Sequence, residues 1–211
     1  VARMAASLGA EVTVCGPFGG EVGSVLTTML AEEKLGVRGV PYNAGNGAYI
    51  HDRRGGDRET LAHMVPPQPT RHELDDLYGT VLVEALECDV FVITGSEPQR
   101  VLPAGFFSRI VRDVRSADKL IVADLSGAAA KAAASEGPTV LKMSHEELID
   151  AELVEDASLE SLQAAGRELV AGGVEAMLIS RAGEPTLLVT AESSRLLVGP
   201  VVTPLDHRGA G

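Results

Sequence analysis

The sequence predicts an α/β protein with three layers, α/β/α, whose helices flank a mostly parallel sheet and which also carries a small β lid. From residue 73 to residue 180, short runs rich in valine, isoleucine and leucine alternate with stretches of helical spacing. Strands that alternate with helices form parallel sheets covered on both faces. Between residues 46 and 64 two strand-like runs flank a polar, glycine-rich turn, which predicts a hairpin outside the main sheet.

The first elements surround a glycine-rich segment. Residues 1–8 have the pattern of a helix end with Gly9 as its C-cap, so we expect a missing segment upstream. A strand is predicted over residues 11–15 and a helix over residues 24–35, joined by G-P-F-G-G-E-V-G at residues 16–23. Four glycines in eight residues allow the backbone to approach a ligand closely, but a tight strand-to-helix turn also explains them.

The remaining elements follow in regular order. After a strand at 37–40 and the lid, we expect helix 73–86, strand 89–94, helix 103–116, strand 119–123, helix 127–135, strand 139–142, helices 145–151 and 158–171, strand 176–180, and a terminal hairpin of 186–190 and 195–198. The sequence has no internal repeat, which predicts a single domain over residues 1–211 with a lid hairpin at about 46–64. In a Rossmann-like sheet, ligands bind beyond the carboxyl ends of the strands.

Charge and composition narrow the function classes. The 211 residues carry a net charge of −12, which repels phosphate backbones and anionic lipid, so neither a nucleic-acid nor a membrane partner is expected. No apolar run approaches the roughly 18 residues of a membrane helix, and the N-terminus lacks a signal-peptide pattern. Cys15 and Cys88 lie at the edges of apolar runs, which predicts buried thiols. We therefore expect a cytoplasmic enzyme.

Polar loops follow three successive strands. They read G-S-E-P at 95–98, D-L-S-G at 124–127 and K-M-S-H-E-E at 142–147. Ser and Asp are also common helix N-caps, so a single such loop is weak evidence for a ligand site. Three such loops in succession are stronger evidence. The chain has neither a Walker G-x-x-x-x-G-K nor a G-x-G-x-x-G turn after a strand, which disfavours a P-loop nucleotidase and a nicotinamide-dependent oxidoreductase. Near the end, G-A-G at 209–211 would present backbone N–H groups to an anion if it opened a helix.

Taken in order, these motifs resemble the ribokinase-like (pfkB) family of carbohydrate kinases, most closely its phosphofructokinase and tagatose-phosphate kinase branch. The glycine segment resembles the family's G-x-x-G-G-x-x-G, and the three loops resemble G-S-L-P, D-T-S-G and K-P-N-x-x-E-L. S-R-A-G-E-P at 180–185 resembles the S-x-G-x-x-G nucleotide loop, and D-H-R-G-A-G at 206–211 resembles D-T-x-G-A-G-D without its last residue. The resemblance covers essentially the whole chain, and this collinearity is more specific than any single motif.

The resemblance implies a ribokinase-like fold and ATP-dependent phosphorylation of a primary hydroxyl of a sugar or sugar phosphate. It implies ATP and Mg²⁺ as cofactors, a monovalent cation as an optional one, and a homodimer through the lid. The implied site residues are Gly209, Ala210 and Gly211 as the anion hole, Lys142, Ser144, Ser180 and Gly183 at the nucleotide, Gly19, Gly20 and Ser96 at the sugar, and Glu147 (near Mg²⁺ through water) and Asp206 (in the monovalent-cation loop) as metal residues. The catalytic aspartate is expected directly after Gly211, so we expect the chain to be truncated at both ends.

Some loops depart from the family pattern and keep a second function open. Met143 and Ser144 stand where the family has proline and asparagine, and Ala182 and Pro185 stand where the nucleotide loop has glycine. These departures motivate the alternative of a catalytically impaired relative that binds a sugar phosphate or has a regulatory role. The identity of the sugar is not determined by the sequence.

Overall fold

The computed structural model describes residues 1–54, 59–95 and 101–199. The described residues divide into two compact units. Unit 1 holds residues 1–54, 59–87 and 101–102, and unit 2 holds residues 88–95 and 103–199. In this part of the chain, no helix combines the length and the apolar character needed to cross a membrane.

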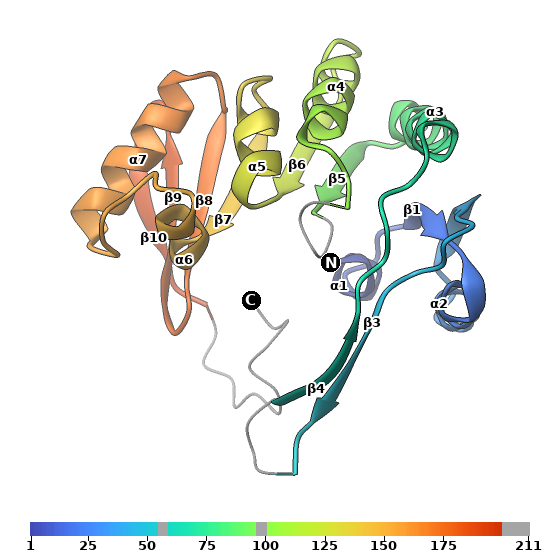
Figure 1. Ribbon diagram of the computed structural model, residues 1–211. Coiled ribbons are helices and arrows are strands. Elements are labelled where there is room, and N and C mark those ends of the chain that lie inside the picture. Colours follow the sequence, from blue (N-terminus) through green and yellow to red (C-terminus); the bar gives the residue numbers. More distant parts are fainter. Residues whose placement is uncertain (55–58, 96–100, 200–211) are drawn as a thin grey trace. The chain divides into compact units, whose positions relative to one another are not determined.

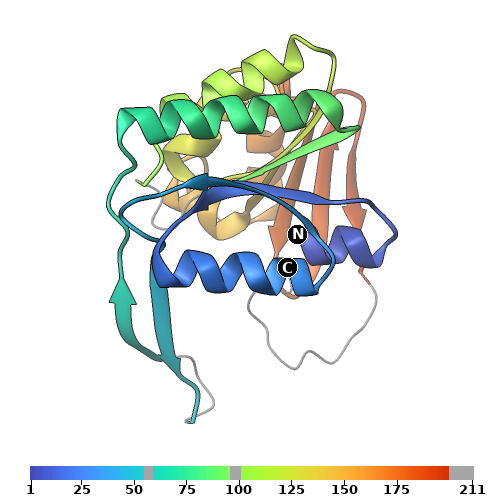
Figure 2. The ribbon, with the colours of Figure 1, turned by 90° about the vertical axis from the view of Figure 1, so that its right-hand side faces the viewer.

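Unit 1 is built on a pair of parallel strands, β1 (Thr13–Phe18) and β2 (Gly36–Pro41). Helices α2 (Gly20–Glu32) and α3 (Arg71–Glu87) lie on opposite sides of this pair (Figures 1 and 2), and a short α1 (Ala2–Ser7) precedes it. Its buried apolar side chains come mainly from β2, the segment after it and α3: Leu35, Val40, Tyr42, Leu77, Tyr78, Val81 and Ala85. Unit 1 therefore has its own small core.

The glycine-rich turn between β1 and α2 is much shorter than predicted. Pairing with β2 continues through Phe18, which lies opposite Pro41, and the N–H of Tyr42 donates to the carbonyl of Phe18 at 3.2 Å. Helix α2 then begins at Gly20, with Gly19 as its N-cap. The strand pairing thus extends over the first half of a segment whose glycines had suggested an open turn.

The lid region forms an antiparallel hairpin of β3 (Ala48–Asp52) and β4 (Glu59–Met64), which extends away from α2 and the β1–β2 pair (Figure 2). On one face, the Tyr49 ring stacks on the rings of His63 and His51, with centroids 3.9 and 5.6 Å away. Neighbouring residues of a strand point to opposite faces, so the other face carries Ala48, Ile50, Ala62 and Met64. Every residue of β4 is exposed.

Glu73 joins the two segments that lead into and out of the hairpin. Its side chain accepts the N–H of Asn43 at 2.8 Å and both the N–H and the hydroxyl of Thr70 at 2.7 Å. The Tyr42 hydroxyl donates to the carbonyl of Pro67, and burial raises the pKa of this hydroxyl, which keeps it protonated as a donor. The root of the hairpin is therefore fixed by the polar contacts of Glu73 and Tyr42.

We expect Glu73→Gln to lower the thermal unfolding midpoint by several degrees at pH 7, because the amide NH₂ would face N–H donors. The N–H of Asn43, then the hydroxyl and N–H of Thr70, hold the pKa of Glu73 below its usual range. Because its pKa is lower in the folded than in the unfolded protein, ionised Glu73 stabilises the fold at pH values above its unfolded-state pKa of about 4.3. This contribution is lost as the pH falls through the pKa of the folded state. The deficit of Glu73→Gln should therefore shrink below pH ~4.

Thermal unfolding of both proteins between pH 3 and pH 7 tests this prediction. Asp75→Asn is the matched control, because Asp75 lies on the same helix and has an exposed contact with Arg71 at 3.9 Å. A deficit that is independent of pH would contradict the role given to the Glu73 charge.

Unit 2 contains, within the described residues, a six-stranded sheet in the order β10-β9-β8-β7-β6-β5. Its strands are β5 (Val90–Thr94), β6 (Leu120–Asp124), β7 (Val140–Ser144), β8 (Ala176–Arg181), β9 (Glu184–Thr190) and β10 (Ser194–Leu197). Strands β5 to β8 are parallel, and β9 and β10 continue the sheet in antiparallel pairing. The sheet is therefore mostly parallel, as the alternation of elements predicted.

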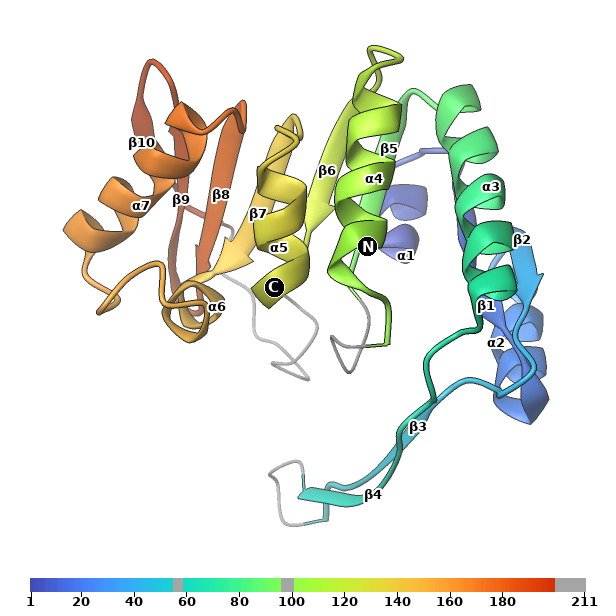
Figure 3. The same cartoon turned by 45° about the horizontal axis from the view of Figure 1, so that its top comes forward.

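The helices of unit 2 bury alternate residues of the sheet. These helices are α4 (Ala104–Arg115), α5 (Gly127–Ala134), α6 (His145–Asp150) and α7 (Leu159–Ala171). Figure 3 shows α4, α5 and α7 in front of the strands. The strand residues beneath the helices are at most 1% exposed: Ile121, Ala123, Leu141, Met143, Met177, Ile179, Leu187 and Val189. The intervening residues, among them Lys142 and Ser144, point to the opposite face.

Candidate functional site

The carboxyl ends of β6 and β7 carry an ion pair. Asp124, the last residue of β6, lies opposite Lys142 of β7 in the parallel register. Lys142 Nζ is 3.0 Å from Asp124 Oδ1, and the two side chains are 29% and 34% exposed. Ligands of such sheets bind at this end of the strands. The ion pair therefore keeps the ammonium group of Lys142 at this edge. A positive charge there would attract an anionic ligand, although the protein as a whole is acidic.

The next turn holds Ser144 and Glu147 together. Ser144 is the N-cap of α6, and its hydroxyl accepts the N–H of Glu147 at 3.1 Å. In return, Glu147 Oε2 accepts the N–H of Ser144 at 2.6 Å. This is a capping box, which satisfies two backbone donors at the start of a helix. The carboxylate is thereby held in one orientation, with its other oxygen outside the capping box.

Strand β8 brings Ser180 beside this turn. Ser180 lies opposite Ser144 in the parallel register, and the His145 Nδ1 atom is 3.4 Å from the carbonyl oxygen of Ser180. Lys142, Ser144 and Ser180, three of the predicted nucleotide residues, therefore lie on adjacent strands at one edge of the sheet. Asp124 belongs to the same edge, and the sequence analysis did not select it as a site residue.

The fourth predicted nucleotide residue, Gly183, lies at the tip of a tight turn. Arg181 of β8 lies opposite Glu184 of β9, so Ala182 and Gly183 are the two residues that reverse the chain. Ala182 has a φ of +51°. This is the left-handed region, which glycine adopts easily and which is unfavourable for residues that have a Cβ atom. A glycine here, as in the loop pattern that this segment resembles, would adopt this conformation without the steric cost of a Cβ atom.

We expect Ala182→Gly to raise the free energy of unfolding by up to about 1 kcal/mol, because it removes left-handed strain at an exposed position where no packing is lost. Ala164→Gly is the control with the same chemical change. Ala164 is an exposed residue inside α7, where glycine costs about 1 kcal/mol. Urea denaturation of both variants should give shifts of opposite sign. Destabilisation by both would contradict the strain at Ala182.

In unit 1, Gly19 and Gly20 form the link from β1 to α2. A Cβ on Gly19 would lie 1.6 Å from the carbonyl oxygen of Tyr42, and Gly20 has a φ of +63°. The glycines are therefore required by a close backbone contact and by a left-handed conformation. Asn46 contacts the same turn from 27 residues away. The sequence analysis did not select Asn46, because no local pattern connects residues that are so far apart in the sequence.

The remaining predicted site residues, Ser96, Asp206, Gly209, Ala210 and Gly211, lie outside the described residues. Within residues 1–54, 59–95 and 101–199, no three His, Cys, Asp or Glu side chains gather to hold a metal ion. In proteins, Mg²⁺ usually takes one or two carboxylates and completes its shell with water and phosphate. Asp124 and Glu147 each place a carboxylate at this edge of the sheet.

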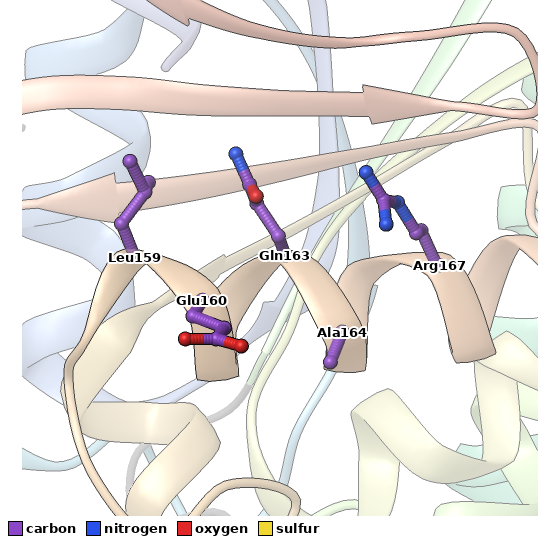
Figure 4. A pocket seen from close by; sticks show the side chains of 5 residues that line it. All are labelled: Leu159, Glu160, Gln163, Ala164 and Arg167. Carbon is purple, nitrogen blue, oxygen red and sulfur yellow. The ribbon is translucent and has the colours of Figure 1, made fainter.

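A surface hollow in unit 2 lies along α7 and differs in kind from this edge. Its lining residues all come from that helix, as Figure 4 shows: Leu159, Glu160, Gln163, Ala164 and Arg167. Ligand sites usually collect polar groups from several elements around an apolar pocket. We therefore take the carboxyl ends of β6, β7 and β8 as the candidate site.

Comparison with known proteins gives matches at the level of both family and fold. A sequence model described as pfkB family carbohydrate kinase matches residues 1–211. The 1-phosphofructokinase of Bacillus subtilis (strain 168) is 30% identical over 125 residues, which are 59% of this chain and 41% of that protein. The chain thus spans about two fifths of the length of this curated relative.

Two solved structures of phosphofructokinase-2 from Escherichia coli have a similar fold. The structure in complex with fructose-6-phosphate has a TM-score of 0.80 and 22% identity, covering 99% of this chain and 69% of that one. The structure in complex with potassium has a TM-score of 0.79 and 24% identity, covering 96% and 66%. This likeness confirms the predicted fold class.

Proposed function

Because the chain belongs to the pfkB family of carbohydrate kinases, as its motifs predicted, we propose that the protein transfers the γ-phosphoryl group of ATP to a primary hydroxyl of a sugar or sugar phosphate. The observation that carries the proposal is the family match over residues 1–211. The edge formed by Asp124, Lys142, Ser144 and Ser180 supports it, since it offers a cation and hydroxyl groups to a phosphate. The predicted cytoplasmic location is part of the proposal.

Each residue has a physical task in this proposal. Phosphoryl transfer depends mainly on positioning and on stabilising charge. Lys142 attracts the phosphates, and Asp124 keeps its ammonium group at the strand end. The capping box holds the carboxylate of Glu147, which would lie near Mg²⁺ through water, and Mg²⁺ would neutralise phosphate charge. The family resemblance assigns the anion hole to Gly209, Ala210 and Gly211 and sugar binding to Gly19, Gly20 and Ser96; of these residues, the structure describes only Gly19 and Gly20. Asp206 belongs to the monovalent-cation loop.

An assay of ADP release by the full-length protein tests the proposal. The substrates are ATP with fructose 6-phosphate, fructose 1-phosphate, tagatose 6-phosphate or fructose, with KCl or NaCl as the salt. We expect ADP release only in the presence of one of these acceptors, and a higher rate in KCl if a monovalent cation is used. Calorimetric binding of a sugar phosphate without ADP release would instead support the non-catalytic alternative. If the protein neither releases ADP with any of these acceptors nor binds a sugar phosphate, the proposal is overturned.

We also propose that the lid hairpin pairs with a second copy of the chain through the face that carries Ile50 and Met64, which are 60% and 55% exposed. Ile50→Glu should then reduce the molar mass measured by light scattering to that of a monomer. Leu197→Glu is the control, because Leu197 is an exposed apolar residue of a strand in unit 2. An unchanged mass for Ile50→Glu would contradict the assignment of this face.

A further inference from the structure

Asn46 binds the turn between β1 and α2 from 27 residues away. Its Oδ1 atom accepts the N–H of Gly19 at 2.9 Å, and its Nδ2 atom donates to the carbonyl of Pro17 at 2.9 Å. Its own backbone N–H donates to the carbonyl of Gly19 at 3.1 Å. One residue therefore satisfies a donor and two acceptors of a three-residue segment.

The segment that carries Asn46 lies directly against the backbone of this turn. A Cβ on Gly20 would be 3.3 Å from the Gly45 Cα atom, and a Cβ on Gly45 would be 3.6 Å from the Gly19 carbonyl oxygen. A Cβ on Gly23, in the first turn of α2, would be 2.8 Å from Asn46 Oδ1. The contact is thus backbone on backbone, and the Asn46 amide is the side-chain group that joins the two segments.

Asn46 is also two residues before the start of β3, the first strand of the lid hairpin. The hairpin root is fixed on its other side by Glu73, which binds Asn43 and Thr70. The conformation of the Gly19–Gly20 turn and the position of the hairpin root therefore depend on the same amide group. Two hydrogen bonds of the side-chain amide and one of the backbone N–H of Asn46 connect this turn to the start of the hairpin.

We propose that Asn46 is a positioning residue for sugar binding: it fixes the Gly19–Gly20 turn and couples it to the lid hairpin. The inference rests on the proposed function, in which this turn faces the sugar. Hydrogen bonds that hold backbone groups in a binding conformation reduce the ordering that a ligand would otherwise have to impose. Loss of the amide should therefore weaken the sugar phosphate and leave ATP unaffected, because the proposed nucleotide residues belong to unit 2.

The test compares Asn46→Ala, Asn46→Asp and the control Asn43→Ala in the full-length protein. Asn43 is exposed and uses its backbone N–H, which alanine retains. We expect Asn46→Ala to raise the KM for the sugar phosphate about tenfold, with the KM for ATP changed less than twofold. Asn46→Asp keeps the acceptor for Gly19 but loses the donor to Pro17, so it should fall between wild type and alanine. Asn43→Ala should match the wild type.

These readouts separate positioning from a merely structural role. Partial unfolding lowers the concentration of active enzyme and therefore the apparent kcat, but it leaves KM unchanged. An unchanged KM for the sugar phosphate in Asn46→Ala, or equal increases for both substrates, would overturn the inference. The dissociation constant of the sugar phosphate, measured by calorimetry on the same variants, decides the matter if the wild type binds without turnover. In that case the kinase proposal fails, but tenfold weaker binding by Asn46→Ala supports the role of Asn46. If the wild type does not bind the sugar phosphate at all, both the kinase proposal and the role of Asn46 are overturned.

Discussion

Gly19→Ala is expected to disrupt unit 1 and to abolish turnover. The added methyl carbon would lie 1.6 Å from the Tyr42 carbonyl oxygen and 3.0 Å from the Tyr42 Cβ atom. Neither neighbour is the end of a flexible side chain, so the segment from Tyr42 to Asn46 must move away from the turn. That movement breaks the bonds between Asn46 and Gly19. We expect the free energy of unfolding to fall by about 3 kcal/mol or more.

Gly16→Ala provides the matched control for this substitution. Gly16 lies on β1, three residues before Gly19, and a Cβ there would meet the Phe18 ring at 3.7 Å, an ordinary contact. Urea denaturation and limited proteolysis of the two variants should therefore differ strongly, with Gly16→Ala close to wild type. Wild-type stability of Gly19→Ala would show that residues 42–46 do not lie against this turn.

Glu147→Gln is expected to leave stability unchanged and to reduce turnover 10- to 100-fold. Glutamine can keep the hydrogen bond to the Ser144 N–H, since a capping box accepts Glu or Gln at this position. The variant loses only the negative charge. Outer-shell carboxylates of metal sites are commonly worth about 10–100-fold in metal affinity or activity, so the Mg²⁺ concentration that gives half-maximal rate should also rise.

Two further variants separate the charge of Glu147 from its capping role. Glu147→Ala removes both, and it should in addition lower the free energy of unfolding by about 0.3–1.5 kcal/mol. Glu146→Gln changes an exposed neighbour in the same helical turn and should behave like the wild type. Wild-type turnover and Mg²⁺ dependence in Glu147→Gln would mean that Glu147 serves only as a cap.

The elements of this protein could be predicted from local patterns. Strands β5 to β8 and the helices between them agree with the predicted ranges to within about three residues, because apolar periodicity is a local property of the sequence. The main error in the first unit was the turn before α2. Pairing of Phe18 with Pro41 extends β1 through a glycine-rich segment. The partner residue lies 23 positions later in the sequence, so a local pattern could not predict this pairing.

The candidate site could be predicted only where its residues belong to one motif. Ser144 and Glu147 are three residues apart, and their reciprocal capping follows a recognisable S-x-x-E spacing. The pairing of Asp124 with Lys142 depends instead on the register of two strands. The position of Asn46 on the Gly19 turn depends on how the chain returns from β2.

The sequence by itself determined the order and type of the elements, the family and the motifs that carry the proposed chemistry. Tertiary structure alone decided which of these residues touch: Glu73 reaches both Asn43 and Thr70, and Gly19 must be glycine because the Tyr42 carbonyl occupies the place of its side chain. The physical reason is that helical and strand propensities act over a few neighbouring residues, whereas these contacts are made between segments brought together only when the chain packs.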